Sequence, residues 1–158
     1  MFRPLKRKNK ELSADRCKSI LKEEKRGVLS VIGDDGYPYG MPMNHYYCED
    51  DGCIYFHCGT GGHRSDALGK CSKASFCVYD GGYRNEGEWA LNISSVIVFG
   101  RIEFISDADT VTDITSRLSR KFTSDEDYIR KEIGLHAHRT VLLRLSPEHI
   151  CGKLVCEA

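Results

Sequence analysis

Two short acidic turns that end in glycine restrict what this chain can fold into. The turns, DDG at 34–36 and EDDG at 49–52, separate runs that are rich in β-branched and aromatic residues. Such runs, joined by tight turns, predict consecutive antiparallel strands rather than helices or a parallel sheet. We therefore expect an antiparallel meander with strands at 27–33, 37–47 and 53–58.

The second of these strands contains two prolines. Pro38 and Pro42 have no amide hydrogen to donate to a neighbouring strand. Strand 37–47 is therefore expected to lie at an edge of the sheet, or to be bulged or unpaired at these two positions. A strand interrupted in this way is a suitable place for backbone atoms to meet a ligand.

The rest of the chain adds strands and short helices. Apolar alternation predicts strands at 73–80 and 139–145, and the run 93–105 is expected to be the longest strand, in the middle of the sheet. Six or seven antiparallel strands with peripheral helices favour a closed or partly closed β-barrel over a doubly wound sheet. Four helices are predicted. The first starts after Ser13, the second lies around 65–69, and the third starts at Asp107 or Asp109. The fourth runs from 124 to 133 and ends at Gly134.

Length and barrel size set the expected organisation. A chain of 158 residues can bury a sizeable core, and we expect one domain over 1–158, with a basic tail and helix at 1–26 and the barrel core at 27–154. The interior of a small barrel is filled by side chains. A cofactor would therefore lie outside the barrel or at a contact between subunits, which makes a dimer the expected assembly for a large ligand.

Charge and cysteine content argue against several classes of protein. The 23 basic residues balance the 23 acidic ones, so net charge gives no reason to expect a nucleic-acid partner. No apolar run approaches the roughly 20 residues that cross a bilayer, and no secretory signal is visible, so we expect a cytoplasmic protein. The eight cysteines include no CxxC pair, so we expect free thiols and no metal site.

A glycine-rich turn joins a predicted strand to the start of a helix within 54–70. In the strand, Tyr55 and His57 should share one face, opposite Cys58 and its alternate neighbours. The turn GTGG at 59–62 allows positive φ values and exposes amide groups, and a helix start with Arg64 follows it. These features predict an anion site that suits a phosphate. Because the turn matches neither nucleotide-binding glycine motif, the alternative is a tight loop with a solvent-facing arginine.

Three stretches resemble pyridoxamine-phosphate oxidase-like flavoproteins, in particular the nitroimidazole-resistance (Nim) branch. They are RGVLSVIGDDGYPYGMPMNHYY, DGCIYFHCGTGGHRSDALGKCSKASFCVYD and SSVIVFGRIEFI, and the ending ICGK is similar too, so the resemblance covers 27–154. It implies a mainly β fold with peripheral helices, an antiparallel split β-barrel of six or seven strands. It also implies a homodimer that binds FMN in a groove between the subunits.

The resemblance implies a set of site residues as well. Arg64 and the His63 region would hold the phosphate, and His63 could instead lie over the flavin ring as a catalytic group. The segment 89–95 would complete the groove from the second subunit, although Ile93 and Ser94 stand where relatives often carry an aromatic residue. The implied cofactor-binding residues are Met43, Asn44, His57, Cys58, Gly62, His63, Arg64, Trp89 and Ser95.

The leading hypothesis is an FMN-dependent oxidoreductase that reduces a small nitroaromatic or quinone-like acceptor, with NAD(P)H as a possible electron donor. Oxidation of pyridoxamine phosphate is not expected, because the chain lacks the full set of basic phosphate ligands. One alternative is a flavin carrier or sensor without turnover, and another is a structural domain with an anion-stabilised turn. A third is a haem-binding or haem-degrading protein, with His57, His63, His136 or His138 as axial ligand.

Overall fold

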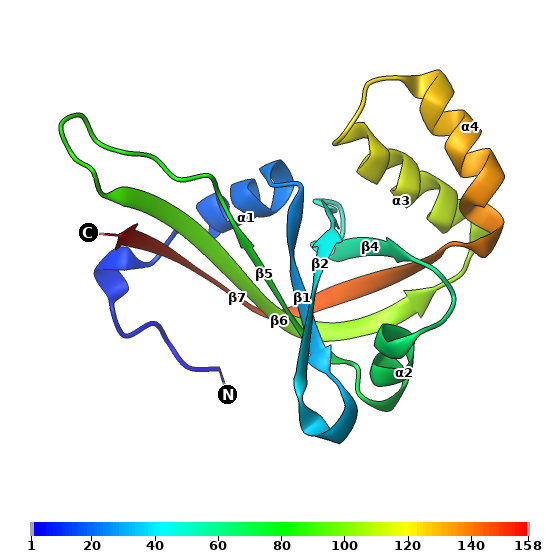
Figure 1. The fold of residues 1–158 in the computed structure, drawn as a ribbon, viewed down its shortest axis with the longest axis horizontal. Coiled ribbons are helices and arrows are strands. Elements are labelled where there is room, and N and C mark those ends of the chain that lie inside the picture. Colours follow the sequence, from blue (N-terminus) through cyan, green and yellow to red (C-terminus); the bar gives the residue numbers. More distant parts are fainter. Residues whose placement is uncertain (1, 158) are drawn as a thin grey trace.

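One antiparallel sheet organises the chain. The computed structural model describes residues 2–157, and seven strands lie side by side in the order β2-β1-β5-β6-β7-β4-β3 (Figure 1). The strands are β1 (Arg26–Ile32), β2 (Pro38–Asn44), β3 (Tyr46–Tyr47), β4 (Ile54–Cys58), β5 (Lys73–Tyr79), β6 (Leu91–Ile105) and β7 (Val141–Glu157). The helices are α1 (Ala14–Glu23), α2 (His63–Lys70), α3 (Ala108–Arg120) and α4 (Glu126–His136), with short 3-10 turns η1 (Lys8–Lys10), η2 (Asp34–Gly36) and η3 (Ala137–Arg139).

The sheet curls until its two edges meet at His45. Strands β2 and β3 lie at opposite ends of the strand order, yet only His45 separates them in the chain. The predicted single strand 37–47 is therefore wrong, because the chain changes from one edge to the other at this residue. The edge position predicted from Pro38 and Pro42 is confirmed for β2. The mainly β, split-barrel fold class is confirmed as well.

Strands β6 and β7 pair along almost their whole length. β7 spans 17 residues and β6 spans 15, so the prediction that 93–105 forms the longest strand is wrong, although β6 does lie in the middle of the sheet. The predicted strand 139–145 continues instead to Glu157. The register shifts after Phe99, where a Cβ on Gly100 would lie 2.1 Å from the carbonyl oxygen of Ser146. Glycine lets the two strands approach this closely.

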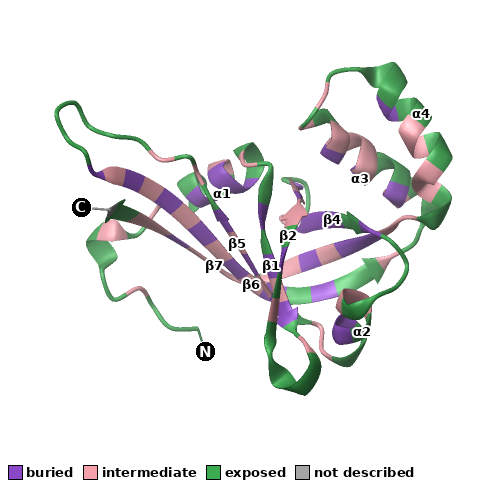
Figure 2. Ribbon diagram, in the orientation of Figure 1, coloured by how far each residue is buried: buried purple, intermediate pink, exposed green. Residues whose placement is uncertain are grey.

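The barrel core lies on the inward face of the sheet. Figure 2 shows buried residues alternating with half-buried ones along β6, as expected for a strand with one face in the core. Helix α1 begins at the predicted cap, since the Ser13 hydroxyl accepts a hydrogen bond from the amide of Arg16 at 3.2 Å. Its buried residues Cys17, Ile20 and Leu21 belong to the same core cluster as the barrel interior.

Helices α3 and α4 form a hairpin near β4 (Figure 1). Asp107 caps α3, and Val111 and Ile114 pack with Tyr55 of β4 in a second apolar cluster. The prediction that α4 ends before Gly134 is wrong, because the helix continues to His136. Within residues 2–157, none of the helices has both the length and the apolar character needed to cross a bilayer.

Candidate functional site

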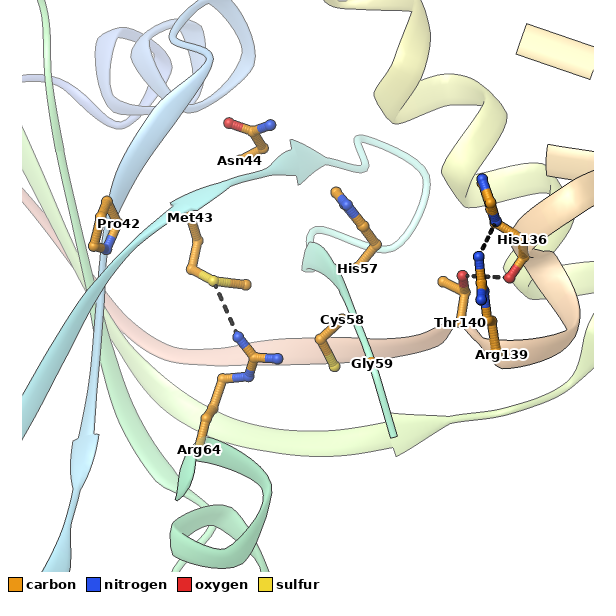
Figure 3. Close-up of a pocket in the computed structure, with 10 residues that line it drawn as sticks. All are labelled: Pro42, Met43, Asn44, His57, Cys58, Gly59, Arg64, His136, Arg139 and Thr140. Carbon is orange, nitrogen blue, oxygen red and sulfur yellow. Dashed lines mark hydrogen bonds between the residues drawn. The ribbon is translucent and has the colours of Figure 1, made fainter. Parts of the chain in front are cut away.

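A cavity of about 590 Å³ lies beside β2 and β4, and we call it the main cavity. The start of α2 borders one side and the segment 136–140 borders the other (Figure 3). Its volume falls within the usual range for small-molecule sites. The lining residues are Pro42, Met43, Asn44, His57, Cys58, Gly59, Arg64, His136, Arg139 and Thr140.

Strand β4 divides its side chains between the barrel core and the cavity side. Phe56 and Cys58 join the core cluster, whereas Tyr55 packs under α3 and His57 lines the main cavity. The alternation predicted for this strand is therefore confirmed. Pairing of His57 with Leu142 brings the start of β7 beside the end of β4, which places residues just before β7 in the cavity wall.

The first turn of α2 carries unsatisfied donors. Gly62 is the N-cap of α2, with φ +100° and ψ 174°, a backbone conformation that residues other than glycine rarely adopt. No side chain that the structure describes accepts a hydrogen bond from the first amides of this helix. Among the buried side-chain nitrogen and oxygen atoms of residues 2–157, only three lack a hydrogen-bond partner, and two of these are Arg64 Nε and Ser65 Oγ. Among residues 2–157, the acceptor for Arg64 Nη1 is the sulfur of Met43 at 3.5 Å, which is a weak acceptor.

Buried donors at a helix start are typical of an anion-binding site. Buried donors are normally satisfied, and a helix start also leaves its first amide groups without intrahelical partners. An anionic ligand at this point would accept hydrogen bonds from the Arg64 guanidinium and from the first amides of the helix. The residues present therefore fit a phosphate group, as the glycine turn predicts.

Burial and the nearby guanidinium set the charges in the main cavity. Desolvation, helped by Arg64, lowers the pKa of His57 from its ordinary value of 6.5, so His57 is neutral at pH 7. Burial raises the pKa of the Cys58 thiol, and Arg64 opposes this only in part. Cys58 is therefore a thiol rather than a reactive thiolate at neutral pH. Positive charge in the cavity wall comes from Arg64 and Arg139.

The structure brings together Met43, Asn44, His57, Cys58 and Arg64, with Gly62 at the adjoining helix cap. Their roles toward a cofactor stay predictions.

The remaining predicted residues lie elsewhere in this single chain. The His63 ring stacks on Tyr39 at 4.3 Å, and its Nε2 lies 3.3 Å from Asp34 Oδ2, so a catalytic role would require the side chain to leave both partners. Trp89 is 76% exposed in the loop between β5 and β6. The hydroxyl of Ser95 donates to the carbonyl of Lys153 at 3.5 Å, outside the main cavity.

Sequence reasoning missed Arg139 and Thr140, and it considered His136 only as a haem ligand. These residues reach the main cavity because β7 pairs with β4 across more than 80 positions of sequence. Their only local signal is the basic run HAHR directly before an alternating strand.

A smaller cavity of about 290 Å³ opens beside the main one, and we call it the annex. The two cavities share Asn44, His57, His136 and Thr140. The α3–α4 hairpin supplies most of the annex wall. Its other lining residues are Thr115, Leu118, Ser119, Phe122, Thr123, Tyr128, Glu132, Ile133 and Ala137.

Comparison with known proteins places the chain in a family. Residues 13–154 match the sequence model of the pyridoxamine 5'-phosphate oxidase family. The chain belongs to this family. The family match covers β1 to β6, most of β7, α2 and the whole wall of the main cavity. Among curated proteins, a search finds no significant match.

Solved structures support the same fold. A candidate 5-nitroimidazole antibiotic resistance protein from Bacteroides thetaiotaomicron is 19% identical with a TM-score of 0.76, covering 92% of this chain and 87% of the other. A FAD-binding protein from Mesorhizobium loti is 22% identical with a TM-score of 0.64, covering 92% and 96%. A FAD and haem binding protein from Mycobacterium smegmatis is 22% identical with a TM-score of 0.71, covering 92% and 73%.

Proposed function

We propose that this member of the pyridoxamine 5'-phosphate oxidase family binds FMN in the main cavity and reduces a small nitroaromatic or quinone-like acceptor. The observation that carries the proposal is the pair of unsatisfied buried donors, Arg64 Nε and Ser65 Oγ, at the glycine-capped start of α2. The family match and the FAD-binding structural neighbours support a flavin in particular. A cytoplasmic location, where nicotinamide nucleotides are present, fits this function.

The residues of the main cavity suit the two ends of a flavin mononucleotide. Arg64, Ser65 and the first amides of α2 would hold the phosphate by charge-assisted hydrogen bonds. Met43, Asn44 and His57 line the cavity beyond this end and would contact the ring. Neutral His57 can donate or accept a hydrogen bond there without adding a charge.

A bound flavin would supply the transfer of hydride and electrons between a nicotinamide donor and the acceptor. The chain itself needs only to hold the phosphate, orient the ring and leave one face open to a second compound. This division of work explains why the main cavity holds no activated nucleophile, since Cys58 stays protonated and His57 stays neutral.

We further propose a homodimer that forms through the outward face of the sheet. Val28, Cys77, Ile97 and Cys151 lie side by side across β1, β5, β6 and β7 on this face, and Val28 is 40% exposed. An apolar row of this kind favours contact with a second copy. The segment 89–95, with the exposed Trp89, would then reach the groove of the other subunit.

The absorption spectrum of the purified protein tests the cofactor. We expect bands in the near-ultraviolet and blue, and release of FMN rather than FAD when the denatured protein is analysed by chromatography. A Soret band after haem addition would favour the haem alternative, and a protein that takes up neither group would contradict the proposal. If FMN binds, NAD(P)H oxidation with a panel of nitroaromatic and quinone acceptors under anaerobic conditions separates an enzyme from a flavin carrier.

Substitution of Gly62 with alanine is expected to weaken FMN binding about tenfold, because a residue with a Cβ costs about 1–3 kcal/mol in this conformation. The loss would arise from φ alone, since nothing lies within 4 Å of the new Cβ. Gly61→Ala is the matched control: it lies in the same turn with equally open space and no positive φ. Equal affinities for the two variants by fluorescence titration would contradict the role of the Gly62 cap.

A further inference from the structure

The annex has the properties of a separate binding site for a small aromatic compound. An apolar cavity of about 150 Å³ already binds benzene. The annex, at about 290 Å³, is larger, so it has room for one ring with substituents or two fused rings. Leu118, Phe122, Tyr128 and Ile133 give it apolar walls. The FMN proposal uses none of these four residues.

The hairpin that forms the annex wall is held in place by specific contacts. Arg120 Nε and Nη2 donate to the two carboxylate oxygens of Glu126 at 2.7 and 2.9 Å, which ties the end of α3 to the start of α4. At the other end of α4, the Thr140 hydroxyl donates to the carbonyl of His136 at 2.9 Å. These contacts connect the annex wall to its neighbours at both ends of α4.

His136 stands between the two cavities with its two ring nitrogens in different surroundings. Arg139 Nη2 lies 2.6 Å from His136 Nδ1, and Arg139 lines only the main cavity. Glu132 Oε2 lies 3.6 Å from His136 Nε2, and Glu132 lines only the annex. The ring thus directs Nδ1 toward the main cavity and Nε2 toward the annex.

Arg139 determines which nitrogen of His136 carries the proton. A guanidinium can only donate, so the 2.6 Å contact requires an unprotonated Nδ1 that accepts, and the neutral ring then carries its proton on Nε2. The distance of 3.6 Å to Glu132 is too long for a hydrogen bond. The Nε2–H group is therefore a donor at the annex that has no hydrogen-bond acceptor among residues 2–157.

We infer that the annex binds a neutral aromatic compound with a hydrogen-bond-accepting oxygen, which accepts a hydrogen bond from His136 Nε2–H. Arg139 acts as a positioning residue by fixing the tautomer of His136. The carboxylate of Glu132 selects against ligands with a negative charge, because two like charges would share a small cavity. Reduction of the bound compound rests on the proposed function, whereas its binding does not.

Binding of matched ligands to the flavin-free protein tests this inference. By isothermal titration calorimetry, 4-nitrobenzyl alcohol should bind at least about threefold more tightly than 4-nitrobenzoate, and Glu132→Gln should remove or reverse this preference. His136→Gln, whose amide nitrogen can stand where Nε2 stood, should keep the affinity for the alcohol. His136→Ala should lose about 3- to 10-fold, the usual effect of one hydrogen bond. An unchanged affinity for the alcohol in His136→Ala would overturn the inference.

A second measurement does not depend on any change in affinity. Imidazole ¹⁵N chemical shifts should show the Nε2–H tautomer of His136, and the alcohol should shift Nε2 more than Nδ1. Arg139→Leu should produce a mixture of tautomers in a protein with an unchanged circular dichroism spectrum. A ligand that binds without moving the His136 resonances would overturn the inference.

The two proposals fail in different ways. Binding of the alcohol to a protein that takes up no flavin would reject the proposed function and leave the annex as an aromatic site. A flavin-loaded protein that binds neither ligand at the annex would reject the annex inference alone.

Discussion

Replacement of Arg64 with alanine is expected to weaken FMN binding by about 1–3 kcal/mol, roughly 5- to 150-fold, the scale of a hydrogen bond to a charged group. Within the described part of the chain, Arg64 Nε is buried without a hydrogen-bond partner, and Nη1 donates to the sulfur of Met43 at 3.5 Å. A phosphate would therefore displace only the weak contact between Arg64 and the sulfur of Met43. Most of the free energy of its interaction with Arg64 would then contribute to binding. Fluorescence titration of the flavin-free protein with FMN measures the change.

Arg139→Ala is the matched control for this prediction. Arg139 lines the same main cavity and carries the same charge, but it lies at the His136 end (Figure 3). Its removal should change FMN affinity by less than about threefold, since Arg139 lies away from the start of α2 and its exposed charge is screened by solvent. Riboflavin, which lacks the phosphate, should bind the unchanged protein and Arg64→Ala equally well. A similar loss for both arginine variants would mean that only the overall charge of the cavity matters.

The strand–turn–helix unit could be predicted from sequence because its determinants are local. Alternation places His57 on the cavity side, and the glycines with Arg64 mark the start of α2 within a few residues. Pro38 and Pro42 likewise report the edge position of β2, because a missing amide hydrogen is a property of the residue itself. Each of these predictions needs no knowledge of distant parts of the chain.

The opposite side of the main cavity could not be predicted in this way. Arg139 and Thr140 reach it through the pairing of β7 with β4, and no local pattern encodes which distant strands pair. The same limit explains the two wrong strand assignments. The break at His45 follows from closure of the sheet, and the full length of β7 follows from its pairing with β6.

His45 connects this closure to the site. It is fully buried between the two edge strands, directly after Asn44 of the main cavity. Its Nε2 lies 2.8 Å from the carbonyl of Leu21 and donates to it, while Nδ1 is buried without a partner. Lys121 Nζ donates to the His45 carbonyl at 3.1 Å. A proton on Nδ1 would therefore place a second positive charge beside Lys121, with no acceptor for the new N–H.

Stability is expected to fall by up to about 3 kcal/mol as pH decreases from 6.5 to below 4, because of His45 alone. Burial, followed by the charge of Lys121, lowers the pKa of His45 from 6.5 to about 4. Between these values the unfolded chain binds the proton and the folded one does not, so acid favours unfolding. Above pH 6.5 neither state is protonated, and the full stability is present. Urea unfolding at pH 5.0, 5.5, 6.0 and 7.0 measures the slope.

His45→Gln separates this histidine from the carboxylates, because glutamine can still donate to the Leu21 carbonyl but does not titrate. The unfolding free energy of this variant should vary less with pH than that of the unchanged protein. Over pH 5–6.5, the difference in slope should correspond to the uptake of up to one proton on unfolding. Carboxylates such as Asp51 and Asp80, whose pKa values are lowered in the folded state, affect both proteins equally and act mainly below this window. Equal slopes of unfolding free energy against pH for the two proteins would show that His45 binds its proton as readily in the folded state as in the unfolded state. The edges of the sheet would then tolerate a charge at their junction, and closure beside Asn44 would not depend on pH.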